Sequence, residues 1–162
     1  MKISYAITVC NEFVEIQRLV SFLLQKKRYQ DQIVILFDEA NGDPEIEQYL
    51  RTHSINGEFV WHKGAFNKHF ADWKNLLTLY CTGDYIFQID ADELPSETLL
   101  VNIKYLIENN EGIQRFVLQW EDKPCIIYNK EYDELISKYN WSYHKDTGYV
   151  YTHKFNNNKF IL

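Results

Sequence analysis

The sequence has few of the residues that mark domain boundaries. It contains six glycines and three prolines among 162 residues, and no stretch rich in glycine, serine or proline separates one part of the chain from another. No internal repeat is present either. A chain of this length suits one domain with a sizeable core. We therefore expect a single domain over residues 1–162.

Disulfides and membrane spans are also not expected. The three cysteines cannot all pair within one chain, and none belongs to a C-x-x-C motif, so the simpler interpretation is a reduced, cytoplasmic protein. The most apolar helical stretch, LVSFLL at 19–24, is too short to cross a bilayer. The N-terminal MKISYAITVCNEF lacks a cleavage-site pattern and predicts a first strand instead of a signal peptide.

Positive charge is scarce. Lysine and arginine number 17 against 23 aspartate and glutamate residues, for a net charge of −6. Nucleic-acid-binding proteins need a basic face for phosphate contacts, so we expect no nucleic-acid partner. A phosphorylated small molecule could still bind through a metal ion. The sequence has neither G-x-x-x-x-G-K-[ST] nor G-x-G-x-x-G after its first strand, which argues against kinase-like and dinucleotide-binding sites.

Strand-like and helix-like segments alternate along the chain. Apolar, β-branched runs predict strands at 2–9, 32–37, 58–62, 84–89 and 114–120. Apolar residues at helical spacing predict helices at 12–27, 44–53, 67–81 and 95–108. This alternation predicts an α/β fold with a mostly parallel sheet between helices, and with a small strand-and-loop region on the sheet edge from the last forty residues. Ligands of such sheets bind beyond the carboxyl ends of the strands, here near residues 8–12, 38 and 90–93.

Three carboxylates follow the fourth predicted strand: Asp90, Asp92 and Glu93. If the chain stays extended past Ile89, the side chains of Asp90 and Asp92 lie on one face about 6–7 Å apart and repel each other. Capping of a helix that opens at Pro95 would account for one acid but not for three. A divalent cation accounts for the group better, because Mg²⁺ and Mn²⁺ take carboxylate and phosphate oxygens.

Three segments resemble the family 2 glycosyltransferases, which are inverting enzymes of the GT-A fold that use nucleotide-activated sugars. They are ISYAITVCNE (3–12), QIVILFDEANGD (32–43) and FADWKNLLTLYCTGDYIFQIDADELPSE (70–97). The resemblance implies a GT-A (Rossmann-like) three-layer sandwich. It also implies that residues 1–110 bind a nucleotide sugar and that residues 111–162 form a shortened acceptor-side part.

The resemblance places nucleotide-binding residues at eight positions: Thr8, Asn11, Glu12, Asp38, Asp72, Lys74, Asp90 and Ala91. Asp38 would accept a hydrogen bond from the base or ribose, since a carboxylate is an acceptor only, although turn chemistry is an alternative role. Lys74 would steady the diphosphate, with a solvated helix position as the alternative. Asp90, Asp92 and His153 would hold Mn²⁺ or Mg²⁺, which would take up charge as the nucleoside diphosphate leaves.

A general base is also implied, to deprotonate the acceptor hydroxyl. The candidates are Glu121 and Asp122, at the end of the fifth predicted strand, and Glu93. The partners would be a donor, with a UDP-sugar favoured, and an unidentified glycan, lipid or protein acceptor. Two other functions stay open: a catalytically degenerate module that binds a nucleotide sugar or glycan, and a nucleotidyltransferase. A nucleotidyltransferase would want a glycine-rich basic loop where this chain has VCNEFVE.

Overall fold

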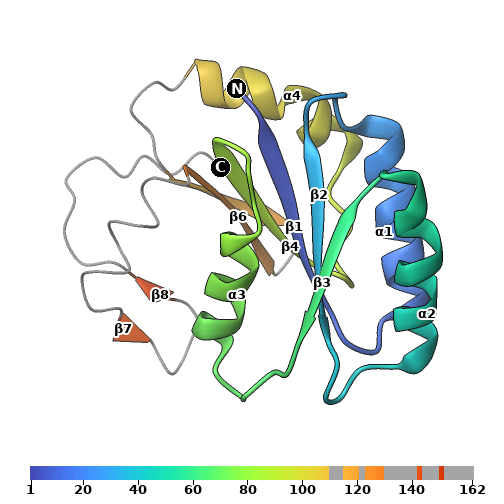
Figure 1. Cartoon of the computed structure of the whole chain (residues 1–162). Helices are drawn as coiled ribbons and strands as arrows, with labels where there is room; N and C mark the ends of the chain where they lie inside the picture. The colour runs from blue at the N-terminus through green and yellow to red at the C-terminus, as the bar shows by residue number, and fades with distance from the viewer. Residues whose placement is uncertain (110–114, 121–122, 130–141, 144–149, 152–162) are drawn as a thin grey trace.

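A six-stranded sheet forms the centre of the protein, in the order β3-β2-β1-β4-β6-β5 (Figure 1). The computed structural model describes residues 1–109, 115–120, 123–129, 142–143 and 150–151. The strands are β1 (Ile3–Val9), β2 (Gln32–Asp38), β3 (Val60–Gly64), β4 (Tyr85–Asp90), β5 (Arg115–Trp120) and β6 (Lys123–Asn129). The first four run parallel, whereas β6 is antiparallel to both β4 and β5. Two short strands, β7 (Ser142–Tyr143) and β8 (Val150–Tyr151), pair with each other.

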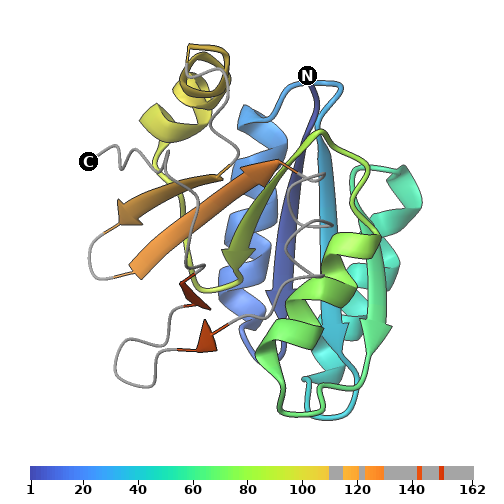
Figure 2. The ribbon, with the colours of Figure 1, turned by 90° about the vertical axis from the view of Figure 1, so that its left-hand side faces the viewer.

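Helices cover both faces of this sheet, which gives three layers (Figure 2). The helices are α1 (Phe13–Lys26), α2 (Pro44–His53), α3 (Phe70–Leu79) and α4 (Glu97–Glu108), with a single 3₁₀ turn at Ser54–Asn56. α1, α2 and α4 contribute buried side chains to the core on one face, and α3 packs on the other. In the described part of the chain, no helix has the length and apolarity to cross a membrane.

Burial on both faces explains why the strands read as continuous apolar runs. In β2, Ile33, Ile35 and Phe37 pack toward α1, α2 and α4, while Val34 and Leu36 pack toward α3. Side chains alternate across a strand, so a central parallel strand needs apolar residues at every position. The predicted α/β fold with a mostly parallel sheet is therefore confirmed.

Buried side chains hold helix α3 against the sheet, and the position of this helix sets one side of the candidate site. Trp73 and Leu77 are four residues apart and both are buried in the core on this face, so they share one side of the helix. After the helix, the ring of Tyr80 stacks on His62 of β3 with centroids 3.6 Å apart and planes 8° from parallel. The chain then turns into β4 at Gly83, whose N–H donates to the Ser4 hydroxyl at 2.9 Å.

Three sequence predictions need correction. The fourth helix does not open at Pro95: it begins at Glu97, and Ser96 caps it by accepting a hydrogen bond from the Leu99 N–H at 3.1 Å. The third helix is shorter than 67–81, because it begins after the cap His69 and ends at Leu79. Finally, β6 is not a strand on the sheet edge, since it inserts between β4 and β5.

Gly83 is predicted to be indispensable to the turn between α3 and β4. A Cβ atom at this position would lie 2.6 Å from the Ser4 backbone nitrogen and 2.8 Å from its hydroxyl oxygen. We expect Gly83→Ala to lower the free energy of unfolding by at least about 1–3 kcal/mol, the usual cost of overpacking. Urea denaturation measures this change. Gly57→Ala is the comparison. A Cβ atom at Gly57 would meet no atom within 4 Å, so only the backbone φ of 71° opposes the substitution. A smaller loss at Gly83 than at Gly57 would contradict this account.

Candidate functional site

The order of the strands reverses between β1 and β4, and this point locates the candidate site. From β1 the chain builds outward through β2 to β3, and it then returns to place β4 on the other side of β1. Thr8 and Asp90 are the paired residues at the carboxyl ends of these two strands. Crevices at such switch points are where open α/β sheets bind their ligands.

Three side chains meet at this point: Thr8 from β1, Asp90 from β4 and Lys74 from α3. The Thr8 hydroxyl donates to Asp90 Oδ1 at 2.8 Å. The Lys74 ammonium donates to the Thr8 hydroxyl at 3.0 Å and forms an ion pair with the same Asp90 oxygen. The Lys74 side chain is 23% exposed and that of Asp90 is 51% exposed, so a ligand can reach the cluster from solvent.

Beyond β4 the backbone turns sharply instead of staying extended. The Ala91 N–H still bonds the Thr8 carbonyl at 3.1 Å, but the Glu93 N–H then bonds the Asp90 carbonyl at 2.9 Å. The Glu93 carboxylate folds back to accept the Asp90 N–H at 3.0 Å. The extended geometry considered for Asp90 and Asp92 is therefore wrong. Asp92 instead occupies the tip of the turn, where it is exposed.

Helix capping does not explain this acidic turn. Helix α4 begins at Glu97 and takes its cap from Ser96. The helix dipole acts mainly within the first turn, and Asp90, Asp92 and Glu93 all precede that turn. The capping alternative is therefore wrong for these three residues. Asp90 is instead held by Thr8 and Lys74, and Glu93 accepts the Asp90 N–H.

Asp38, the last residue of β2, is only 4% exposed and its carboxylate is fully engaged. Oδ1 accepts the N–H groups of Ala40 and Phe66, both at 3.1 Å, and Oδ2 accepts the Asn41 side-chain amide at 2.8 Å. Burial alone would raise the pKa of Asp38, but the hydrogen bonds from Asn41, Phe66 and Ala40 together hold this pKa below its usual range. Asp38 thus joins the loops after β2 and β3. The expected hydrogen bond from the base or ribose of a nucleotide to Asp38 stays a prediction.

The loop after β1 is organised by Glu12. Its carboxylate accepts the N–H of Cys10 at 2.9 Å and the N–H of Asn11 at 3.0 Å. The Cys10 carbonyl in turn accepts the Asp43 N–H from the loop after β2 at 2.9 Å. Glu12 therefore shapes the backbone at the carboxyl edge, and Asn11 is exposed beside it.

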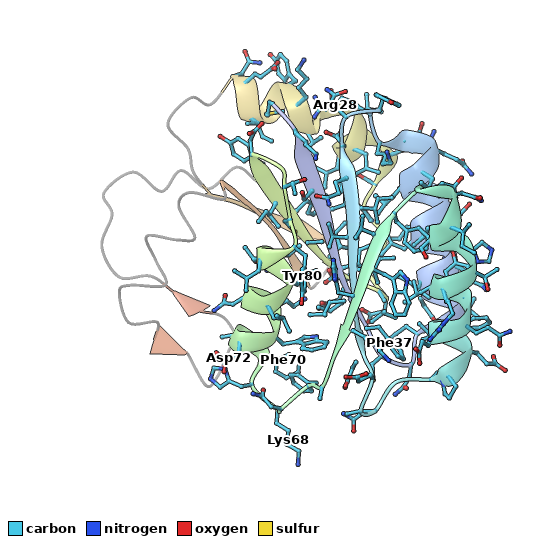
Figure 3. All side chains as sticks on the ribbon, in the orientation of Figure 1. Arg28, Phe37, Lys68, Phe70, Asp72 and Tyr80 are labelled. Atoms are coloured by element: carbon cyan, nitrogen blue, oxygen red, sulfur yellow. The ribbon has the colours of Figure 1, made fainter. Side chains whose placement is uncertain are left out.

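Asp72 is separated from the cluster by the geometry of its helix. It lies two residues before Lys74, which places the two side chains about 200° apart around α3. Its carboxylate contacts His69 Nδ1 at 3.1 Å and is 65% exposed. Figure 3 shows Asp72 with Lys68 and Phe70 near the start of the helix. The structure thus brings Lys74 to the switch point and leaves Asp72 on another side.

The donor atoms at this edge suit a hard divalent cation that shares its ligands with phosphate. Among the residues that the structure describes, no three His, Cys, Asp or Glu side chains form a cage for a metal. Mg²⁺ does not require such a cage, because it is usually bound by one or two carboxylates plus substrate phosphates. Asp90 and Asp92 provide carboxylates of this kind. The residues present therefore fit Mn²⁺ or Mg²⁺ only together with a phosphorylated ligand.

Three predicted site residues, Glu121, Asp122 and His153, lie outside the described part of the chain. On either side of the first two, Trp120 of β5 and Lys123 of β6 pair with each other.

Sequence reasoning missed the contribution of Phe66, whose backbone N–H donates a hydrogen bond to Asp38. A backbone donor leaves no signal in residue type. The turn chemistry given as the alternative role of Asp38 is present, because Asn41, in the turn-forming run DEAN, donates its side-chain amide to Asp38.

The sequence matches no family model and no curated protein, but the fold has known relatives among solved structures. The mannosyltransferase PcManGT from Pyrobaculum calidifontis, in complex with GDP-Man and Mn²⁺, has a TM-score of 0.65 at 13% identity, covering 83% of this chain and 46% of its own. TarS 1–349 of S. aureus in complex with UDP-GlcNAc has a TM-score of 0.61 at 12% identity, covering 85% and 48%. A cytidylyltransferase from Leptospira borgpetersenii has 0.58 at 15% identity, covering 85% and 64%.

These likenesses define the class of fold. The chain has the α/β GT-A (Rossmann-like) three-layer architecture that its sequence predicts. It spans about half the length of PcManGT and of TarS 1–349, and 64% of the cytidylyltransferase. Known proteins of this architecture therefore include sugar transferases and nucleotidyltransferases.

Asp38 is predicted to stabilise the carboxyl edge through its negative charge. Both oxygens of Asp38 accept hydrogen bonds from N–H donors, so in Asp38→Asn the amide NH₂ faces an N–H donor in either orientation. We expect a loss of about 1–3 kcal/mol in the free energy of unfolding at pH 7. Because the folded-state pKa of Asp38 is lowered, this advantage of the wild type is present above the unfolded pKa of about 3.9 and is lost as the pH falls below it. Urea denaturation at pH 7 and pH 3 measures both effects.

Glu39→Gln is the matched control for this substitution. Glu39 follows Asp38 directly, but its side chain is 42% exposed and pairs only at the surface with Lys63 at 3.2 Å. We expect this change to stay within about 0.5 kcal/mol of the wild type. Equal stability of Asp38→Asn and the wild type at pH 7 would show that the buried carboxylate has no such role.

Proposed function

We propose that the protein is a metal-dependent, inverting glycosyltransferase of the family 2 type, with a UDP-sugar as the favoured donor. The observation that carries this proposal is the meeting of Thr8, Lys74 and Asp90 at the switch point, with Asp92 on the adjacent turn. A cation and carboxylates gathered at one edge of the sheet suit a metal-bound diphosphate. Relatives of the same fold that bind GDP-Man with Mn²⁺ and UDP-GlcNAc support it.

In this proposal each part of the edge has its own task. Asp90 and Asp92, with His153 as a further ligand, would hold Mn²⁺ or Mg²⁺. When bound, the ion would act as a Lewis acid that stabilises the charge on the departing diphosphate. The nucleoside would lie along the loops after β1 and β2, near Thr8, Asn11, Glu12 and Asp38, with Ala91 beside Thr8 at the end of β4.

The reaction would be a single displacement at the anomeric carbon. The acceptor hydroxyl oxygen forms a bond to this carbon, the bond from the carbon to the diphosphate oxygen breaks, and the configuration inverts. A carboxylate takes the hydroxyl proton. The candidates for this base are Asp122, Glu121 and Glu93, of which Glu93 also accepts the Asp90 N–H.

A second candidate is a nucleotidyltransferase, because a cytidylyltransferase shares the fold. The match covers 64% of that protein, a larger share than for PcManGT or TarS 1–349. The two activities release different products. A glycosyltransferase releases a nucleoside diphosphate from a nucleotide sugar, with water as a slow acceptor if no other is present. A nucleotidyltransferase releases pyrophosphate from a nucleoside triphosphate.

The test is to incubate the protein and Mn²⁺ with a panel of UDP- and GDP-sugars, and separately with CTP or UTP plus sugar phosphates, and to quantify both products. We expect nucleoside diphosphate from at least one nucleotide sugar. Pyrophosphate release instead would assign the second candidate. Binding of nucleotide sugars with neither product, across a range of acceptors, would identify a degenerate binding module.

The acidic turn gives a direct prediction. Asp92→Asn keeps the shape of the side chain but removes its charge, so we expect metal-dependent donor binding to weaken at least about 100-fold while the fold is retained. Calorimetry with Mn²⁺ measures the binding, and thermal unfolding checks the fold. Asp84→Asn is the control, because Asp84 lies before the opposite end of β4 and bonds the Lys2 N–H there. Unchanged donor binding by Asp92→Asn, with the same metal requirement, would rule out the metal role.

A further inference from the structure

The ion pair between Lys74 and Asp90 places a positive charge where the proposed function needs a metal ion. The Lys74 ammonium is held by two acceptors at once, the Thr8 hydroxyl at 3.0 Å and Asp90 Oδ1. Thr8 donates its own proton to the same Asp90 oxygen at 2.8 Å. Each of the three side chains thus contacts the other two.

The position of this ammonium is set by the packing of α3. Trp73, next to Lys74 in the chain, and Leu77 are both buried against the sheet. The Thr78 hydroxyl bonds the Lys74 carbonyl at 3.0 Å within the helix. With the helix backbone anchored in this way, the Lys74 side chain reaches the switch point while only 23% of it is exposed.

A divalent cation at this edge would compete with this ammonium for Asp90. Both would be attracted to the same carboxylate, and at neighbouring positions they would repel each other with twice the energy of two unit charges. A phosphate group changes the balance, because it offers acceptors to Lys74 and ligands to the metal together. An ammonium has three N–H donors, and Thr8 and Asp90 account for two of them.

We propose that Lys74 is the resident counter-ion of Asp90, and that it keeps a divalent cation off this carboxylate until a diphosphate draws the ammonium away. This inference rests on the proposed function for the identity of the diphosphate. Metal and nucleotide then bind cooperatively. By thermodynamic linkage, each raises the affinity for the other by the same factor.

The test measures Mn²⁺ binding without nucleotide, by electron paramagnetic resonance of the free ion. We expect weak binding by the wild type and binding at least about tenfold tighter by Lys74→Met, because the competing charge is gone. With UDP and Mn²⁺ both present, the same variant should bind UDP at least about tenfold more weakly than the wild type, since the phosphates lose their cation. Lys74→Arg keeps the charge and should resemble the wild type in the Mn²⁺-only titration.

Two controls make the result specific. Lys104→Met removes the same charge from α4, where Lys104 pairs with Glu108 at 3.3 Å, and should leave both titrations unchanged. Lys74→Gln is a second neutral variant that can still hydrogen-bond to Thr8 and Asp90, so it answers the question if Lys74→Met does not fold. Mn²⁺ affinity in the neutral variant equal to that of the wild type would overturn the inference.

The Mn²⁺-only titration also separates this inference from the proposed function. If no nucleotide binds to the wild type, the proposed function fails. Tighter Mn²⁺ binding by the neutral variant would then still show that Lys74 excludes the metal. If nucleotides bind but the neutral variant gains no Mn²⁺ affinity, the inference fails alone.

Discussion

The pairing of β1 with β4 is the contact on which the candidate site depends. These strands are distant in sequence, and their register sets Thr8 opposite Asp90. One hydrogen bond of 2.8 Å joins the two side chains, and the Ala91 N–H extends the pairing by one more residue before the chain turns. A slip of one residue in this register would move Asp90 to another neighbour and its side chain to the other face of the sheet.

The elements around this pair serve to hold it. Helix α3 packs on one face through Trp73 and Leu77, while the rings of Tyr80 and His62 secure the end of the helix to β3. Asp38 ties the loops after β2 and β3 through its buried carboxylate. Buried apolar contacts therefore give the edge its rigidity, and hydrogen-bonded loops give it its shape. A site for a charged ligand needs both, because its polar groups must stay in place without the ligand.

Local patterns in the sequence were sufficient to predict the parallel half of the fold. The apolar runs of β1, β2 and β4 and the helical spacing in α1 leave a clear signature, because each element buries a defined face. The place of β6 could not be predicted in this way. Its pairing with β5 is local, but its antiparallel pairing with β4 joins segments that are distant in sequence, and the last forty residues have only weak periodicity.

The same distinction applies to the site. Asp90 and Lys74 could both be singled out from the sequence, since strand ends and a resemblance to known enzymes point to them. Their ion pair could not, because it depends on the packing of α3 beside the carboxyl ends of β1 and β4. Likewise the sequence predicts Asp38 as an acid at a strand end, but its hydrogen bond from the Phe66 N–H depends on tertiary contacts alone.

The central claim is that this edge binds a nucleoside diphosphate with a divalent cation. Calorimetric titration of the wild-type protein with UDP, GDP and CDP, first with Mn²⁺ and then with a chelator, tests it most directly. The account predicts micromolar binding of UDP that disappears when the metal is removed. A folded protein that binds none of the three nucleotides under either condition would contradict it.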